Sequence, residues 1–102
     1  MNIQSRTYDT GVVRVSAAGE LDMATADDLA KALHDAIGHP ATTTVVVDFV
    51  QVSFCDSSGI EALDIAYGNA ATTGISLRVT NLQSGVRRVL ELTGLLNALT
   101  GP

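Results

Sequence analysis

The chain has 102 residues, of which 46% are hydrophobic and only 4% aromatic, so we expect one domain with a core of aliphatic side chains. Eleven acidic residues against six Lys and Arg give a net charge of −5, which argues against nucleic acid as a partner because phosphate contacts need clustered cations. The single cysteine, Cys55, excludes an intrachain disulfide and any all-cysteine metal site, and it is typical of a reducing cytosol.

The N-terminal segment and the hydropathy pattern argue against export and membrane insertion. Residues 1–10 have no charged start followed by an apolar run, so they do not resemble a secretory signal. The longest strongly apolar run, residues 45–52, is short and is interrupted by Asp48. We therefore expect a cytoplasmic protein that acts without a membrane.

The first forty residues predict a β-hairpin followed by a helix. Residues 2–8 and 11–18 are the predicted strands, and Asp9-Thr10-Gly11 is the turn between them. A helix is predicted over residues 25–37, where Thr25 stands three residues before Asp28 in a loose form of the capping box. Its apolar face comprises Leu29, Leu33, Ala36 and Ile37, and Gly38 with Pro40 ends it.

The rest of the chain alternates between strand and helix patterns. Residues 42–52 are rich in β-branched side chains at consecutive positions, which is typical of a strand in the middle of a sheet. A second helix follows the polar residues 56–59 and ends near Thr73. Its predicted inner stripe is Ile60, Leu63, Tyr67 and Ala70. The remaining predicted elements are a strand over 75–81, a helix from Ser84 to Gly94 with Val86, Val89 and Leu90 inward, and a short strand over 95–100.

This order predicts a single α/β domain over residues 1–102. Strands that alternate with single helices form parallel pairs joined by crossover helices, whereas the N-terminal hairpin is antiparallel. The sequence therefore predicts a small mixed sheet of four to five strands.

The polar cluster Asp56-Ser57-Ser58-Gly59 lies between a predicted buried strand and a predicted helix. Its simplest interpretation is a helix start, because Ser58 followed by Glu61 matches the capping box. In that arrangement Ser58 accepts a hydrogen bond from the amide of Glu61, and Glu61 accepts one from the amide of Ser58. Asp56 adds a favourable negative charge at the positive end of the helix.

The same geometry permits a functional interpretation. If Ser58 is the cap, then Ser57 lies just outside the helix with a free hydroxyl, and Gly59 allows another protein to approach closely. A helix N-terminus tolerates an anion, so a phosphoryl group on Ser57 would add about −1.5 to −2 charges without unfolding the helix. Such a modification would be a binary switch at a protein interface.

The residues give little support to catalysis, metal binding or redox chemistry. Neither Ser57 nor Ser58 has the glycine spacing of a nucleophile elbow. The two histidines, His34 and His39, fall at the end of the first predicted helix and just after it. Two histidines and scattered acids match no metal-ligand spacing. Cys55 is best interpreted as a small buried hydrophobe. We expect no enzyme activity, no metal and no cofactor.

Three segments resemble the bacterial anti-sigma factor antagonists of the STAS domain family, and they occur in the family's order. Residues 47–63, VDFVQVSFCDSSGIEAL, resemble its main signature. Residues 19–29, GELDMATADDL, resemble the segment that leads into the first helix, and residues 85–99, GVRRVLELTGLLNAL, resemble the C-terminal helix and the turn after it. Together they span nearly the whole chain.

The resemblance implies a sheet of four or five strands with helices packed mainly on one face. It also implies an anti-sigma factor antagonist, which binds an anti-sigma factor that is also a serine kinase and so releases a sigma factor. The kinase phosphorylates the antagonist and ends the binding, and a serine phosphatase restores the active form. The acceptor in the family is the first hydroxyl after the aspartate, which is Ser57 here, with Ser58 as the runner-up. We expect the antagonist to be a monomer.

The expected partner-binding surface combines the two signature segments. Parallel strands end at one edge of a sheet, so Glu20 and Asp22 are expected near the polar cluster. The predicted partner-binding residues are Glu20, Asp22, Asp56, Ser57, Ser58, Gly59 and Glu61. At Glu61 the sequence departs from the family, which has a small residue there, and the carboxylate adds repulsion beside the acceptor. The alternative hypothesis is a STAS scaffold domain that binds a partner constitutively and is never phosphorylated.

Overall fold

The computed structural model describes residues 1–8 and 10–101, and in that part of the chain one four-stranded sheet is combined with four helices. In chain order the elements are β1 (Asn2–Thr7), β2 (Val12–Leu21), α1 (Ala26–Gly38), β3 (Thr44–Cys55), α2 (Ser57–Thr72), β4 (Ser76–Thr80), α3 (Ser84–Thr93) and α4 (Leu96–Thr100).

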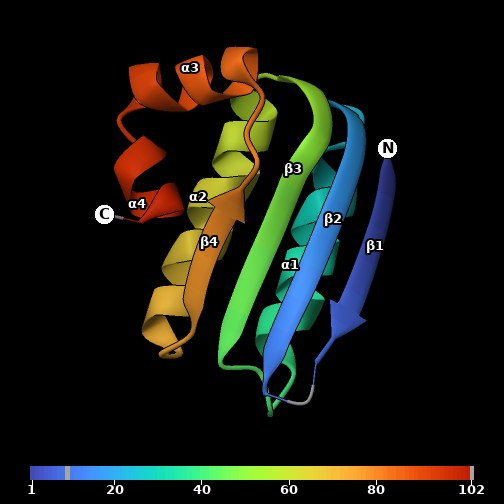
Figure 1. Cartoon of the computed structure of the whole chain (residues 1–102), viewed down its shortest axis with the longest axis vertical. Coiled ribbons are helices and arrows are strands. Elements are labelled where there is room, and N and C mark those ends of the chain that lie inside the picture. Colours follow the sequence, from blue (N-terminus) through green and yellow to red (C-terminus); the bar gives the residue numbers. More distant parts are fainter. Residues whose placement is uncertain (9, 102) are drawn as a thin grey trace.

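The sheet is mixed and its strands follow the order β1-β2-β3-β4. β1 pairs antiparallel with β2, whereas β2 with β3 and β3 with β4 are parallel pairs, connected by α1 and α2. Figure 1 shows α1 and α2 behind the sheet, with the opposite face of the sheet toward the viewer. The predicted α/β class, the mixed sheet and the packing of helices on one face are therefore confirmed.

The N-terminal hairpin is confirmed by its register, in which Asn2 lies opposite Ala18 and Thr7 opposite Val13. Asp9, in the predicted turn, lies outside the described residues. Gly11 has a positive φ of 81°, and a Cβ there would lie 2.7 Å from the carbonyl oxygen of Ala41. Only glycine fits this position, because both the backbone conformation and the close approach exclude a side chain.

The core lies between the sheet and the helices, and the strand alternation decides which residues enter it. Where β2 and β3 pair without irregularity, their odd-numbered residues point toward the helices. Because side chains alternate along a strand, the even-numbered residues lie on the opposite face of the sheet, which α1 and α2 do not cover. The largest fully buried side chains are Phe49, Leu21, Leu29, Leu33, Leu63, Leu90, Leu99, Val15, Val45, Val47, Val52 and Val86. Apart from Phe49, these side chains are aliphatic, as the low aromatic content predicts.

The strand predicted over residues 95–100 is wrong, because Leu96–Thr100 forms the short helix α4. Leu96 and Leu99 are both buried and stand three residues apart, which is the spacing of one helix face and not that of a strand. α4 packs beside β4, and Figure 1 shows it next to that edge strand. Among residues 1–8 and 10–101 the sheet accordingly has four strands.

The predicted inner stripe of α2 is correct except at one residue. Tyr67 is 36% exposed, whereas Ala66 is buried together with Ala62 and Ala70. These alanines recur every four residues, so they form one face of the helix. Their small side chains allow α2 to lie close to its neighbours, and the ring of Tyr67 remains at the surface.

Both central strands are longer than predicted. β2 continues to Leu21, past the predicted end at residue 18, and β3 continues to Cys55, past residue 52. Their parallel pairing passes through two register irregularities, the second between Gly19 and Glu20. The extension brings the two signature segments side by side at one end of the sheet.

No helix in residues 1–8 and 10–101 is both long enough and apolar enough to cross a membrane.

Candidate functional site

The ends of β2 and β3 hold the two signature segments together. Leu21 is paired with Cys55, and the amide of Asp56 donates a hydrogen bond to the carbonyl oxygen of Leu21 at 3.0 Å. Because parallel strands end at the same edge of a sheet, the segment after Leu21 and the start of α2 emerge next to each other. The predicted proximity of these two segments is therefore confirmed.

The helix cap is Asp56, and the predicted capping box of Ser58 and Glu61 is wrong. The backbone of Asp56 is extended, and its Oδ1 accepts a hydrogen bond from the amide of Ser58 at 2.9 Å. β3 ends at Cys55, so the helix begins two residues earlier than the Ser-x-x-Glu pattern indicates. An aspartate at this position satisfies one free amide of the first turn and also places negative charge at the positive end of the helix.

Ser57 is the first residue of α2, so the prediction that it lies just outside the helix is wrong. Its side chain is nevertheless exposed, while that of Ser58 is half-buried. Within the described part of the chain, neither hydroxyl takes part in a hydrogen bond. The hydroxyl of Ser57 is therefore accessible at the positive end of the helix, beside amides that have no partner within the helix.

Gly59 allows the first turn of α2 to pack closely against the ends of β2 and β3. A Cβ at this position would lie 2.5 Å from Leu21 Cγ and 2.8 Å from Cys55 Sγ. Gly59 is itself buried, so it is a packing residue at the centre of the two segments. The predicted role of Gly59, to let a partner approach closely, is therefore replaced by a role in internal packing.

Asp22 holds the turn that leads from β2 into α1. Its Oδ1 accepts hydrogen bonds from the amides of Ala24, at 3.0 Å, and Thr25, at 3.2 Å. Thr25 precedes α1 but makes no side-chain cap, so the predicted pairing with Asp28 is absent. The Thr25 hydroxyl instead donates to the carbonyl oxygen of Glu20 at 2.8 Å. Glu20 lies at the end of β2, opposite Phe54, and is exposed.

Three exposed apolar side chains around this site were missed by the sequence analysis. Met23 is 80% exposed, Phe54 48% and Ile65 56%. Met23 and Ile65 also line a groove between α1 and α2, together with Ser58, Glu61, Ala26, Asp27, Ala30 and Ala62. The exposure of Ile65 was predictable from the sequence, because Ile65 falls two residues after Leu63 and hence on the opposite face of the helix from the predicted stripe.

Cys55 is buried, as predicted, and its thiol is not activated. Desolvation and the neighbouring charge of Asp56 raise the pKa of Cys55 to about 11. The thiol is therefore protonated at neutral pH, and the thiol is a far weaker nucleophile than the thiolate.

His39 lies far from the serines in the fold. α1 starts at the edge where β2 ends and crosses back, so His39, which caps its C-terminal end, lies at the opposite end of the sheet from Ser57 (Figure 1). Over the described ranges, no three His, Cys, Asp or Glu side chains form a group that could hold a metal ion. The hydroxyl of Ser57 is thus accessible, and His39 is too distant to act as its base.

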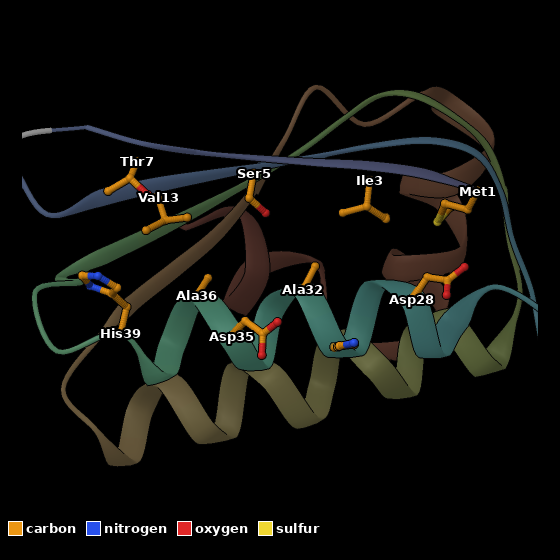
Figure 2. Close-up of a pocket in the computed structure, with 11 residues that line it drawn as sticks. Met1, Ile3, Ser5, Thr7, Val13, Asp28, Ala32, Asp35, Ala36 and His39 are labelled. Atoms are coloured by element: carbon orange, nitrogen blue, oxygen red, sulfur yellow. The ribbon is translucent and has the colours of Figure 1, made fainter.

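A different hollow, of about 630 Å³, separates β1 from α1 (Figure 2). Ile3 and Val13 reach into it from the sheet, and Ala32 and Ala36 face them from α1. Its lining also includes the carboxylates of Asp28 and Asp35 and the side chains of Lys31 and His39. None of the predicted site residues lines this hollow.

Comparison with known proteins identifies relatives over nearly the whole chain. The STAS domain signature matches residues 3–100. The chain is 28% identical over 100 residues to the anti-sigma F factor antagonist of Paenibacillus polymyxa, covering 97% of this chain and 86% of that protein.

Two solved structures share the fold. The anti-sigma factor antagonist SpoIIAA in its unphosphorylated form has a TM-score of 0.83 and 24% identity, covering 98% of this chain and 86% of that one. The Bacillus cell fate determinant SpoIIAA in its phosphorylated form has a TM-score of 0.77 and 23% identity, covering 98% of this chain and 89% of that one.

Proposed function

The chain belongs to the STAS domain family, and we propose that it is an anti-sigma factor antagonist. In this proposal the protein binds an anti-sigma factor that is also a serine kinase, in the cytosol and as a monomer, and the binding releases a sigma factor. It acts by binding and has no catalytic role of its own. The observation that carries the proposal is the exposed hydroxyl of Ser57 at the start of α2, in a chain whose relative from Paenibacillus polymyxa is named for this function.

Phosphorylation of Ser57 is the proposed off-switch. A phosphoryl group at the first position of a helix meets the positive end of the helix dipole, so the modified helix remains stable. The relative named SpoIIAA has been solved in both a phosphorylated and an unphosphorylated form with this fold, which supports the compatibility of the fold with such a change. Removal of the phosphoryl group by a serine phosphatase would return the protein to its binding state.

The phosphoryl group acts on binding through charge in this proposal. Asp56 precedes Ser57 directly, and Glu61 follows one turn later on the exposed surface of α2. A further charge of about −1.5 to −2 then leaves a docked partner facing more negative charge than it can neutralise. The partner's surface at this place is accordingly expected to be basic.

The proposed partner-binding surface contains the exposed or half-buried residues of both signature segments. It comprises Glu20, Asp22, Asp56, Ser57, Ser58 and Glu61, with Gly59 holding the segments together from inside. Asp22 contributes mainly by shaping the turn, because its carboxylate is occupied by local amides. Met23, Phe54 and Ile65 supply apolar contact area next to these acids, as expected of a protein-binding surface with charged residues at its rim.

The proposal is tested by incubating the protein with ATP and each candidate anti-sigma kinase, followed by intact-mass analysis and mapping of the modified residue. We expect one phosphoryl group on Ser57, no modification of Ser57→Ala, and normal modification of Ser58→Ala. Ser84→Ala is the matched control, since Ser84 is an exposed serine at the first position of α3.

Binding of the same kinases to the unmodified protein and to Ser57→Asp gives the second measurement. Weaker binding of Ser57→Asp supports the charge switch, and equal binding contradicts it. A stable complex without any modification supports the alternative, a scaffold domain that binds constitutively, for which the carboxylate of Glu61 beside the acceptor is the favouring observation. If no kinase forms a complex, the proposed function is wrong.

A further inference from the structure

The open face of the sheet carries a pair of guanidinium groups that the proposed function does not use. Arg6 of β1 lies directly opposite Arg14 of β2 in the antiparallel register, so both side chains are on the same face. This is the face toward the viewer in Figure 1, away from α1 and α2. Like charges placed directly opposite each other are destabilising, so the pair is a cost that internal packing does not explain.

The two arginines border an open hollow of about 550 Å³. The hollow is lined by Gln4, Ser5, Arg6, Tyr8, Arg14 and Ser16. Ser5 differs from the other five, because the alternation along β1 directs its side chain to the opposite face of the sheet. Each of these five side chains can donate a hydrogen bond, and Gln4 lies directly opposite Ser16 in the register. Over residues 1–8 and 10–101, no carboxylate lines this hollow.

Both guanidinium groups are held in position before any ligand arrives. Arg6 stacks over the ring of Tyr8, with its central carbon 5.6 Å from the ring centroid. Arg14 donates one hydrogen bond, from Nη2 to Oδ2 of Asp48, at 2.6 Å. A guanidinium has five N–H donors, so Arg14 retains donors for a second acceptor.

The charge of Asp48 is satisfied away from the hollow. Its Oδ1 accepts from the amide of Val50 at 3.0 Å and from Nδ2 of Asn81 at 3.1 Å, and its side chain is only 8% exposed. Asp48 therefore orients Arg14 without presenting a free carboxylate oxygen to a ligand. Two guanidinium groups against one buried carboxylate leave the hollow with a net positive charge inside a chain whose overall charge is −5.

We propose that the hollow between β1 and β2 binds a phosphate group carried by a small molecule or by a phosphorylated side chain. A phosphate presents three or four acceptor oxygens, which matches five donor side chains better than the two oxygens of a carboxylate do. Planar guanidinium groups bind phosphate oxygens in pairs, and preorganised donors lose little entropy on binding. The site lies on the face of the sheet opposite α1 and α2, so it can be occupied independently of the partner at Ser57.

The test is a titration of ¹⁵N-labelled protein followed by amide chemical shifts, at constant ionic strength set with chloride. Inorganic phosphate is the first probe. O-phosphoserine, a phosphate monoester, is the second, and the comparison separates a free phosphate ion from a phosphate group that is carried by another molecule. We expect saturable shifts in residues 4–8 and 12–16 with at least one of the two probes. Arg6→Gln should raise the Kd about tenfold or more, because a charge-assisted hydrogen bond is lost.

Arg78→Gln is the matched control. Arg78 and Arg14 both pair with Val46, so the two arginines occupy the same cross-strand row, but Arg78 does not line the hollow and its side chain lies near Gly101. We expect its Kd to stay within about twofold of the original. If both substitutions weakened phosphate binding equally, the loss would reflect the net charge of the protein and not a specific site, and the proposal would be wrong. Shifts that never saturate, or that are confined to residues 57–60 at the start of α2, overturn it as well.

Discussion

A single methyl group at Gly59 tests the contact on which the geometry around Ser57 depends. In Gly59→Ala the new Cβ would lie 2.5 Å from Leu21 Cγ, 2.6 Å from Leu21 Cδ2 and 2.8 Å from Cys55 Sγ. Favourable contacts between nonbonded carbons are about 3.5–4.0 Å long. Leu21 is 0% exposed and Cys55 4%, so neither has space to withdraw. The first turn of α2 has to move away from the strand ends.

Two opposing effects set the change in the free energy of unfolding of Gly59→Ala. Overpacking a core costs about 1–3 kcal/mol, and three contacts this short place the cost at the upper end, about 3 kcal/mol. Replacing glycine by alanine in a helix returns at most about 1 kcal/mol. We therefore expect a net loss of about 2 kcal/mol in the free energy of unfolding. Gly68, in the same helix, has no atom within 4 Å of its Cβ position, so Gly68→Ala should gain about 1 kcal/mol.

The two variants are compared with the original protein by denaturant unfolding followed by circular dichroism. Opposite shifts of the midpoint, with an unchanged slope, are the expected result. For a domain of about 100 residues, each 1 kcal/mol corresponds to about 4–8 °C in Tm, so thermal unfolding gives an independent check. If Gly59→Ala were as stable as Gly68→Ala, the tight packing of α2 against Leu21 would be refuted. If Gly68→Ala were also destabilised, the helix-propensity term would be wrong.

Three further predictions concern single side chains. Asp56→Ala should cost about 1 kcal/mol of unfolding free energy through loss of the helix cap, whereas Ser58→Ala should change it by less than about 0.5 kcal/mol; equal effects in urea unfolding would contradict this cap. Burial raises the pKa of Asp48, but hydrogen bonds from Val50, Arg14 and Asn81 and the Arg14 charge outweigh it and hold that pKa below 3.8. The stabilisation by the ionised Asp48 is thus present above pH 3.8 and is lost as the pH falls through the lower pKa of the folded state. The free energy of unfolding of Asp48→Asn should therefore fall less steeply with acid than that of the original protein, and identical slopes refute this. The raised pKa of Cys55 predicts that stability falls as the pH rises from 9.0 through about 11, and that Cys55→Ala lacks this component; the same fall in both proteins means that other groups cause it.

The segments and their types were predictable because they depend on local patterns. β-branched runs and alternation identified the strands, and apolar residues three and four positions apart identified α1, α2 and α3. α4 was mistaken for a strand because six residues are too few to separate the two periodicities. Leu96 and Leu99 become a helix face only through their packing beside β4.

The start of α2 shows where a local pattern is insufficient. Asp56 and Ser58 are both good caps, and the Ser-x-x-Glu spacing favours Ser58. The end of β3 decides which residue caps the helix. β3 continues to Cys55 because Cys55 pairs with Leu21 of β2. A strand end set by a neighbour 34 positions earlier in the chain cannot be read from the four residues of the cluster.

The sequence by itself determined the α/β class, the order of the elements, the aliphatic core and the exposed serine that we propose as the phosphorylation site. Only the tertiary structure decided which residues meet: Gly59 against Leu21, Asp56 as the cap, and Arg6 opposite Arg14. The physical reason is that helix and strand patterns follow from neighbours within one or two turns, whereas contacts between elements depend on register. A shift of one residue in the pairing of β1 with β2 would move Arg6 to the other face of the sheet.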